Sequence, residues 1–167
     1  MQIAVKDANV FIDLEQSGLL ELWFKLGIET HTTIFIENEL KLGGHREALS
    51  HFSNGNVTSH DLSFAEIALI ENLTTEVHRA AKFNDCSVLY LAEKLGVPLI
   101  TGDGALRKSA RRRHVEIRGV LWIFDELIEQ QLLSPASAAA KLETLLDRGS
   151  FLPMDACTER VNRWNSR

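Results

Sequence analysis

Short β-branched segments that give way to segments with helical spacing are the feature that most restricts the fold of this chain. Residues 2–6 form one such segment, and Val10 and Phe11 follow it at helical spacing. Residues 97–101 give way to Leu106 in the same manner. Alternation of this kind predicts a mostly parallel sheet with helices on both faces and right-handed crossovers. The sequence therefore predicts an α/β fold.

Further elements of the same pattern lie between these two units. A Thr- and Ile-rich run predicts a strand over residues 29–35, followed by a short helix that a pair of glycines closes. Another short strand is expected around Val57. Ser63 and Glu66 fit a capping box that begins a helix. The next helix is expected over residues 84–95.

Length and composition favour one globular unit. At 167 residues with 45% hydrophobic content, the chain can bury one substantial core. No Gly/Ser-rich linker and no internal repeat divides it. We expect an α/β domain over residues 1–118 and a helical C-terminal extension over residues 119–167 that packs on the same domain. Helices of this extension are expected over residues 120–132, after Ser134 and after Pro153.

Targeting and cysteine patterns indicate a soluble protein. The N-terminus enters a strand almost at once, and no later segment approaches about 18 uninterrupted apolar residues, the length that spans a membrane. We therefore expect a cytoplasmic protein with no membrane partner. Cys86 and Cys157 show no paired spacing, which argues against a structural zinc site and a disulfide framework. We expect both to be small buried residues.

Four acidic residues stand where a parallel α/β fold would aim side chains into one cleft. Asp7 and Asp103 each follow a predicted strand. Ligands of open α/β sheets bind outside the carboxyl ends of the strands, so these two acids should lie close together. Asp85 lies in the first turn of its helix, and Glu39 borders the apolar face of the helix after the second strand. Crowded carboxylates have raised pKa values or bind a cation.

Each acid also has a simpler interpretation. Asp7 and Asp103 fit the role of an N-cap or a turn residue. Asp85 fits that of a surface acid stabilised by the helix dipole. Glu37 has a lysine four residues on, the spacing of a solvated ion pair, whereas Glu39 is placed to point toward the sheet edge. Glu37 nevertheless stays an alternative to Glu39 as the second acid.

The four acids predict a site for a hard cation. Oxygen-only ligation favours Mg²⁺ or Mn²⁺ over zinc. Such ions stabilise charge at phosphorus, which suits phosphodiester hydrolysis. Motifs of other enzyme classes are missing from the sequence, since it has no HExxH, no GxSxG and no Walker lysine loop. Asn9 stands where a phosphatase with an aspartyl nucleophile would need an aspartate.

A basic cluster follows Asp103, although the net charge of the chain is -5. Its members are Arg107, Lys108, Arg111, Arg112, Arg113 and His114. A basic rim beside an acidic centre suits a phosphodiester held against bound metal. The alternative is a solvated helix face whose cations favour the helix C-terminus.

Four short motifs are spread over residues 3–119. They are residues 7–13, Thr32-Thr33 leading to Glu39-Leu40, Asn84-Asp85 leading to residues 89–92, and Thr101-Gly102-Asp103 followed by Leu106-Arg107. Together they resemble the motifs of PIN-domain ribonucleases, and among these the VapC-type toxins of toxin–antitoxin modules. The segment after Gly119 resembles the C-terminal extension of some family members.

This resemblance implies a three-layer α/β/α sandwich, a metal-dependent endoribonuclease site and a homodimer. Matched residue by residue, Asp7, Glu39, Asp85 and Asp103 correspond to the family's metal-binding acids, with Thr101 and Asn9 as auxiliary residues. RNA would be the substrate, with Arg107, Lys108, Arg111 and Arg112 as its contacts. In a toxin, an antitoxin protein would occupy the cleft. The alternative from another functional class is a catalytically silent PIN-like module that binds RNA or protein through the basic cluster and the helical extension.

Overall fold

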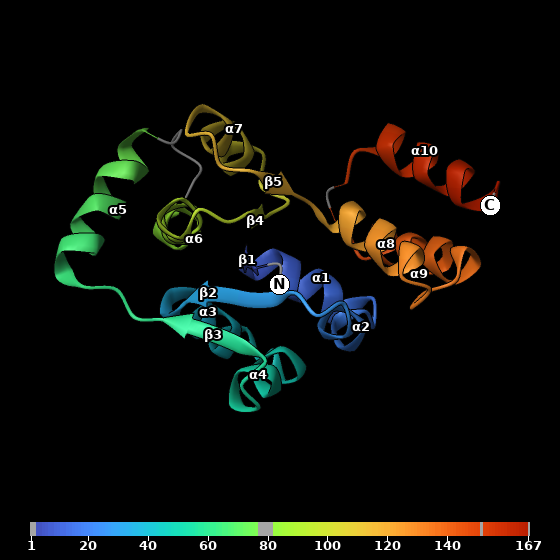
Figure 1. Ribbon diagram of the computed structural model, residues 1–167, viewed down its shortest axis with the longest axis horizontal. Helices are drawn as coiled ribbons and strands as arrows, with labels where there is room; N and C mark the ends of the chain where they lie inside the picture. Colours follow the sequence, from blue (N-terminus) through green and yellow to red (C-terminus); the bar gives the residue numbers. More distant parts are fainter. Residues whose placement is uncertain (1–2, 77–81, 151, 167) are drawn as a thin grey trace.

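The computed structural model describes residues 3–76, 82–150 and 152–166 (Figure 1). Its strands are β1 (Ile3–Lys6), β2 (Glu29–Thr33), β3 (Val57–His60), β4 (Leu99–Ile100) and β5 (Ile117–Arg118). Its helices are α1 (Ala8–Gln16), α2 (Leu20–Lys25), α3 (Ile34–Gly43), α4 (Arg46–Ser53), α5 (Phe64–Glu76), α6 (Phe83–Leu95), α7 (Gly104–Arg112), α8 (Val120–Glu129), α9 (Pro135–Asp147) and α10 (Met154–Asn165). Strands and helices alternate through the first 119 residues, which confirms the α/β class.

The five strands form one sheet in the order β3-β2-β1-β4-β5, and every neighbouring pair is parallel. After β1, the chain builds β2 and β3 on one side and then places β4 and β5 on the other. The strand order therefore reverses between β1 and β4. Lys6 pairs with Ile100 in this register, so the chain leaves both strands at the same edge of the sheet.

Helices cover both faces of the sheet, as the resemblance implied. On one face, α6 contacts β1 and β2, with α5 and α7 beside it (Figure 1). On the other face, α1 packs with α2 and α4. The side chains of Val5, Phe11, Leu14, Trp23 and Leu89 are completely buried between these layers. Burial of such large apolar side chains is the main stabilising contribution to the fold.

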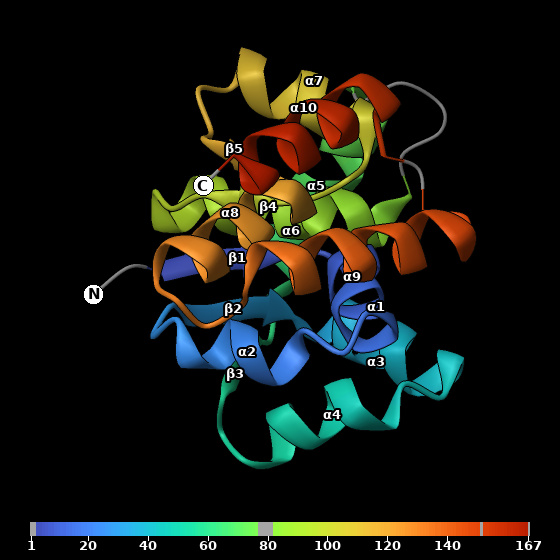
Figure 2. The ribbon, with the colours of Figure 1, turned by 90° about the vertical axis from the view of Figure 1, so that its right-hand side faces the viewer.

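Of the three C-terminal helices, α8 contacts α1 and α2, α9 packs beside α8, and α10 packs on α9 (Figure 2). The ring of Trp122 in α8 meets the ring of Trp23 in α2 edge to face, with 6.4 Å between the centroids. Lys141 in α9 donates from Nζ to the carbonyl oxygen of Ser17 at 2.7 Å. The predicted helix start at Ser134 is confirmed, because its hydroxyl accepts from a backbone N–H in the first turn of α9.

Two local predictions, the capping box before α5 and the burial of both cysteines, are confirmed. The backbone N–H of Ser63 donates to the Glu66 carboxylate at 2.8 Å, and the backbone N–H of Glu66 donates to Ser63 Oγ at 3.3 Å, so the capping box of α5 is present. Cys86 and Cys157 are buried free thiols. No helix in the described ranges is both long enough and apolar enough to cross a membrane.

Three boundaries or elements differ from the predictions. The strand predicted over residues 29–35 ends at Thr33, because residues 34 and 35 already form the first turn of α3. The helix expected over residues 120–132 ends at Glu129, and Gln131 then takes a left-handed conformation with φ +58°. Helix α4 has no counterpart among the predicted elements. Residue 2, the first of the first predicted strand, lies outside the described residues.

Candidate functional site

Two predicted site residues leave the sheet side by side at the point where the strand order reverses. Asp7 follows β1 and is the N-cap of α1, and Asp103 follows β4 and is the N-cap of α7. The backbone N–H of Asp7 donates to the Ile100 carbonyl oxygen at 3.3 Å, which continues the pairing of the two strands. Crevices at such reversal points are the usual ligand sites of open α/β sheets.

The Asp7 carboxylate is buried, with 1% of its surface exposed. Its Oδ1 accepts from the backbone N–H of Val10 at 3.0 Å, and its Oδ2 accepts from the hydroxyl of Thr101. Burial raises the pKa of this carboxyl to about 7. The two hydrogen bonds oppose that shift, whereas the nearby charges of Asp85 and Asp13 add to it. Asp7 is therefore an acid that burial and neighbouring negative charge hold partly protonated near neutral pH.

Thr101 connects the two strand ends. Its side chain is completely buried. The same hydroxyl that donates to Asp7 accepts from the backbone N–H of Asp103 at 3.0 Å. The carboxylate of Asp103 in turn accepts from the backbone N–H of Leu106 at 2.7 Å. Thr101 thus fixes the positions of both acids relative to each other.

Asp85 and Glu39 lie on two different helices, Asp85 at the start of α6 and Glu39 in the middle of α3. Asp85 lies in the first turn of α6, and its carboxylate accepts from the backbone N–H of Lys82 at 3.0 Å. Partial burial raises the pKa of Asp85, and the charges of Asp103 and Glu39 raise it further, against the effect of the Lys82 hydrogen bond. Asn84 Nδ2 donates to Glu39 Oε2 at 2.9 Å and holds Glu39 beside α6.

Glu37 points to a different set of partners. Its carboxylate forms an ion pair with Lys41 at 2.7 Å, the pair that the spacing predicted. The hydrogen bond from Lys41 lowers the pKa of Glu37. Since Glu39 interacts electrostatically with Asp85, its position favours Glu39 over Glu37 as the second acid of the site.

The four acids suit a hard cation in their chemistry but are not gathered around one point. Each offers carboxylate oxygens, and the raised pKa values of Asp7 and Asp85 are those of carboxyls that a cation would help to ionise. Within the described ranges, however, no three acidic, His or Cys side chains lie close enough to hold one ion together. The hydrogen bonds from Lys82 and Asn84 use Asp85 Oδ2 and Glu39 Oε2, and each carboxylate has a second oxygen that could bind an ion.

Asp13 is a further acid of this region that the sequence analysis did not select. It lies in α1 and accepts a hydrogen bond from the hydroxyl of Ser150 at 2.5 Å. Burial raises its pKa, and its charge acts on Asp7. Asp13 and Asp103 line one open cavity of about 450 Å³ together with Asn9. Asn9 and Asp13 are four residues apart on the polar side of α1, and this spacing could have identified Asp13 as a site residue from the sequence.

The basic cluster divides between a groove and the outer surface. Arg107 and Arg111 line a groove of about 610 Å³ beside the acidic cavity. Arg107 Nη1 also donates to the Thr101 carbonyl oxygen at 3.2 Å. Lys108 and Arg112 are exposed on the outer surface of α7. Two of the four predicted RNA contacts are therefore placed near the acids.

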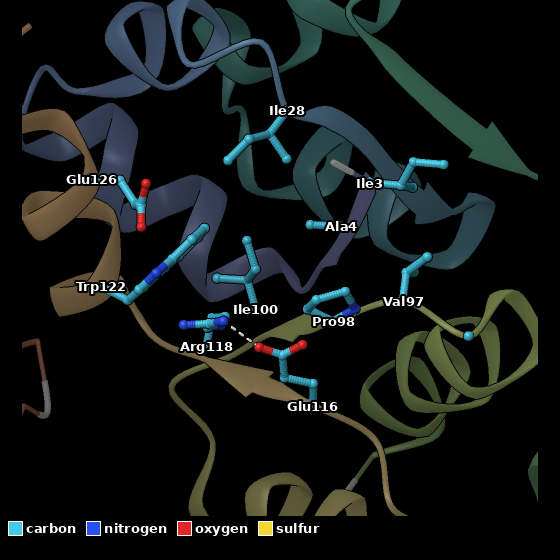
Figure 3. A pocket seen from close by; sticks show the side chains of 11 residues that line it. Ile3, Ala4, Ile28, Val97, Pro98, Ile100, Glu116, Arg118, Trp122 and Glu126 are labelled. Carbon is cyan, nitrogen blue, oxygen red and sulfur yellow. Dashed lines mark ion pairs between the residues drawn. The ribbon is translucent and has the colours of Figure 1, made fainter. Parts of the chain in front are cut away.

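A third cavity lies at the opposite ends of the strands (Figure 3). Its volume is about 350 Å³, and its walls include Ile3 at the start of β1, Pro98 before β4, and Trp122 of α8. Ile3 and Ala4 of β1, which line it, precede the first residue pair between β1 and β4, Val5 with Leu99. The described residues that line it include none of the predicted site residues.

Comparisons with known proteins agree with the fold. Residues 3–166 match the family model DUF3368, described as a PIN domain. Among solved structures, PAE2754 from Pyrobaculum aerophilum is similar in fold, with a TM-score of 0.54 and 17% sequence identity. The alignment covers 77% of this chain and 98% of that one. No curated protein matches the chain.

Proposed function

The chain belongs to the PIN-domain family, and from this premise we propose that it is a Mg²⁺- or Mn²⁺-dependent endoribonuclease that hydrolyses RNA phosphodiester bonds. The observation that carries the proposal is the electrostatic coupling of the predicted acids. Asp85 interacts with Asp7, Asp103 and Glu39, although the chain separates them widely. If Asp7 and Asp103 served only as N-caps of their helices, they would not need to lie near Asp85.

In this proposal the ion is held by Asp7, Glu39, Asp85 and Asp103. When bound there, Mg²⁺ or Mn²⁺ would lower the pKa of a water molecule and offset negative charge on the phosphate. The chain itself supplies orientation. Thr101 fixes Asp7 through its hydroxyl, and the Asn84 amide fixes Glu39. Guanidinium groups on α7 neutralise phosphates of the substrate next to the acids.

The test is cleavage of a labelled RNA that contains both paired and unpaired segments. We expect cleavage by the wild-type protein with Mn²⁺, none with EDTA, and little by Asp7→Asn. Asn keeps the N-cap role at this position, so the variant should fold. Equal cleavage by the wild type and Asp7→Asn would contradict the proposed role of the acids.

A specific observation also supports a second candidate, a PIN-like module that binds RNA or protein without cutting it. The carboxylates of Asp85 and Glu39 already have protein hydrogen-bond donors in Lys82 and Asn84. The two candidates differ in their response to Asp7→Asn combined with Asp103→Asn. A binding module should retain its RNA affinity and show no Mn²⁺-dependent cleavage before or after the change.

The finer proposal is that the protein is the VapC-like toxin of a toxin–antitoxin pair and forms a homodimer. Its substrate would then be a cellular RNA, and an antitoxin peptide would block the acids, with an arginine as a suitable plug for the carboxylates. A short open reading frame directly upstream of the gene would support this form of the proposal. Co-expression of that product should suppress the RNA cleavage.

A further inference from the structure

The groove beside the acids is built by both parts of the chain. Arg107 and Arg111 approach it from α7, and Arg160 approaches it from α10 of the C-terminal extension. Burial lowers the pKa of Arg107, and the nearby charge of Arg111 lowers it further. Like charges placed together in this way are stabilised when an anion binds between them. The guanidinium groups of these three arginines thus line one groove from two distant segments, and a fourth arginine, Arg118, lines it as well but is paired with Glu116.

The groove is continuous with the acidic cavity. Gly102, Gly104, Val120 and Leu152 line both. A Cβ added at Gly102 or Gly104 would meet no atom within 4 Å, so the space beside these two glycines is open. A chain of phosphates could therefore run from Asp103 into the groove without a steric barrier at these residues.

One of the arginines is free and another is held in place. Within the described part of the chain, Arg111 forms no ion pair, and its side chain is exposed. Arg160 Nε donates to the Asp125 carboxylate of α8 at 3.0 Å, which fixes the arginine at the groove wall. Its remaining N–H groups are donors of the kind that bind phosphate oxygens.

Apart from Arg118 and the glycines, the rest of the groove wall is apolar and aromatic. Trp122, Leu152 and Pro153 line it together with the arginines. The guanidinium of Arg118 lies 5.0 Å from the centre of the Trp122 ring. Arginines that follow a backbone, combined with apolar and aromatic surfaces for bases, are the arrangement that binds single strands. Duplex RNA keeps its bases stacked inside and is recognised from outside by its shape.

We propose that this groove binds a single-stranded RNA segment adjacent to the cleaved bond, and that Arg160 of the C-terminal extension is a positioning residue for it. This inference rests on the proposed function and specifies its substrate. Phosphates contact Arg107, Arg111 and Arg160, and bases pack against Trp122 and the Leu152-Pro153 segment. The extension thereby becomes part of the substrate site.

The test measures binding by fluorescence anisotropy with the full chain in EDTA, so that no cleavage interferes. The probes are a labelled unpaired RNA oligonucleotide and the same oligonucleotide in a duplex. We expect tighter binding of the single strand, and about tenfold weaker binding of it by Arg111→Ala and by Arg160→Ala. Arg160→Lys should restore part of the affinity, because it keeps the charge.

Two controls separate groove contacts from general effects. Arg163 also pairs with Asp125, at 2.6 Å, but is not among the groove residues, so Arg163→Ala tests the packing of α10. Arg46 lies on α4, exposed, so Arg46→Ala tests the loss of one positive charge. We expect both controls to bind within about twofold of the wild type, a change at the usual scale of surface substitutions.

Three results would overturn the inference. These are equal loss of affinity in Arg160→Ala and Arg163→Ala, duplex binding as tight as single-strand binding, or wild-type affinity in Arg111→Ala and Arg160→Ala.

A parallel cleavage assay with Mn²⁺ distinguishes the inference about the groove from the proposed nuclease activity. If the groove variants bind RNA as the wild type does and cleavage depends on Asp7, only the inference about the groove is wrong. If the variants show the expected binding pattern but the wild type cleaves no RNA, only the proposed nuclease activity is wrong.

Discussion

Asp7 combines a structural and a chemical role in one carboxyl group. It caps α1 and bonds to Thr101, yet burial raises its pKa to about 7 from an unperturbed value of 3.8. A folded-state pKa above the unfolded one means that the folded state binds the proton more tightly. The contribution of Asp7 to stability is therefore complete below about pH 4 and is lost as the pH rises through about 7.

Asp7→Asn should remove this pH dependence. In EDTA, the variant should gain stability relative to the wild type as the pH rises from about 4 to 7, by about 4 kcal/mol at most. Urea unfolding at a series of pH values measures the difference. Addition of Mn²⁺ at pH 8 should stabilise the wild type more than the variant. A stability difference that stays constant across this range would show that the carboxyl titrates normally.

Lys6, the last residue of β1 and the neighbour of Asp7, is also unusual. Its side chain is completely buried, and its Nζ has no hydrogen-bond partner within the described residues. The amine lies 3.9 Å from the centre of the Trp23 ring and 4.7 Å from that of Phe11. Burial lowers its pKa well below 10.5, although the charge of Asp7 partly opposes the shift. Contact with aromatic faces replaces part of the lost hydration.

Lys6→Met should stabilise the protein at neutral pH, because it removes a buried amine and keeps a long, flexible side chain among the rings. We expect a gain of about 1 to 3 kcal/mol at pH 7 in urea unfolding. The unfolded lysine is protonated below about pH 10.4, so the wild type should approach the variant in stability as the pH rises toward that value. A less stable variant at pH 7 would mean that the aromatic contacts outweigh the cost of burial.

At the scale of elements, Asp125 holds the last helix in place. This carboxylate of α8 accepts from Arg160, from Arg163 and from Trp164 Nε1 at 2.9 Å. The ring of Trp164 is buried and stacks on Phe124, with 5.7 Å between the centroids. One acid thus organises three donors of α10.

Asp125→Asn should loosen α10 and lower the free energy of unfolding by about 1 to 3 kcal/mol, because charge-assisted hydrogen bonds are lost. Hydrogen exchange should increase at the amides of α10 more than at those of α6. Glu126→Gln is the matched control on the same helix, for which we expect a change within about 0.5 kcal/mol. Equal effects of the two substitutions would argue against this role of Asp125.

Helices α5 and α4 differ in how far the sequence predicts them. Helix α5 was predictable, because its capping box lies within four adjacent residues. Helix α4 was not, although Ala48, Leu49 and Phe52 have helical spacing, because its cap comes from elsewhere. The Glu15 carboxylate of α1 accepts from the backbone N–H groups of Glu47 and Ala48. A cap supplied from about 30 residues away leaves no local pattern.

For the whole molecule, the candidate site also combines features that local sequence patterns predict with features that depend on distant residues. The positions of Asp7 and Asp103 after their strands followed from local patterns and from the topology of parallel sheets. The contact between Asp13 and Ser150 joins residues 137 positions apart, and no periodicity predicts it. The convergence of Arg160 with the arginines of α7 likewise depends on how the extension packs.

The charge distribution of the whole chain gives a final prediction. A net charge of -5 opposes general attraction of RNA, so binding should depend on the few arginines of the groove. Each phosphate neutralised in a single strand changes the slope of log binding constant against log salt concentration by about -0.7. Contacts from Arg107, Arg111 and Arg160 predict a slope of about -2 for the wild type. Arg111→Ala should reduce its size by about 0.7, whereas Arg46→Ala should lower affinity slightly without changing the slope. An identical slope in the wild type and Arg111→Ala would mean that RNA contacts a different surface.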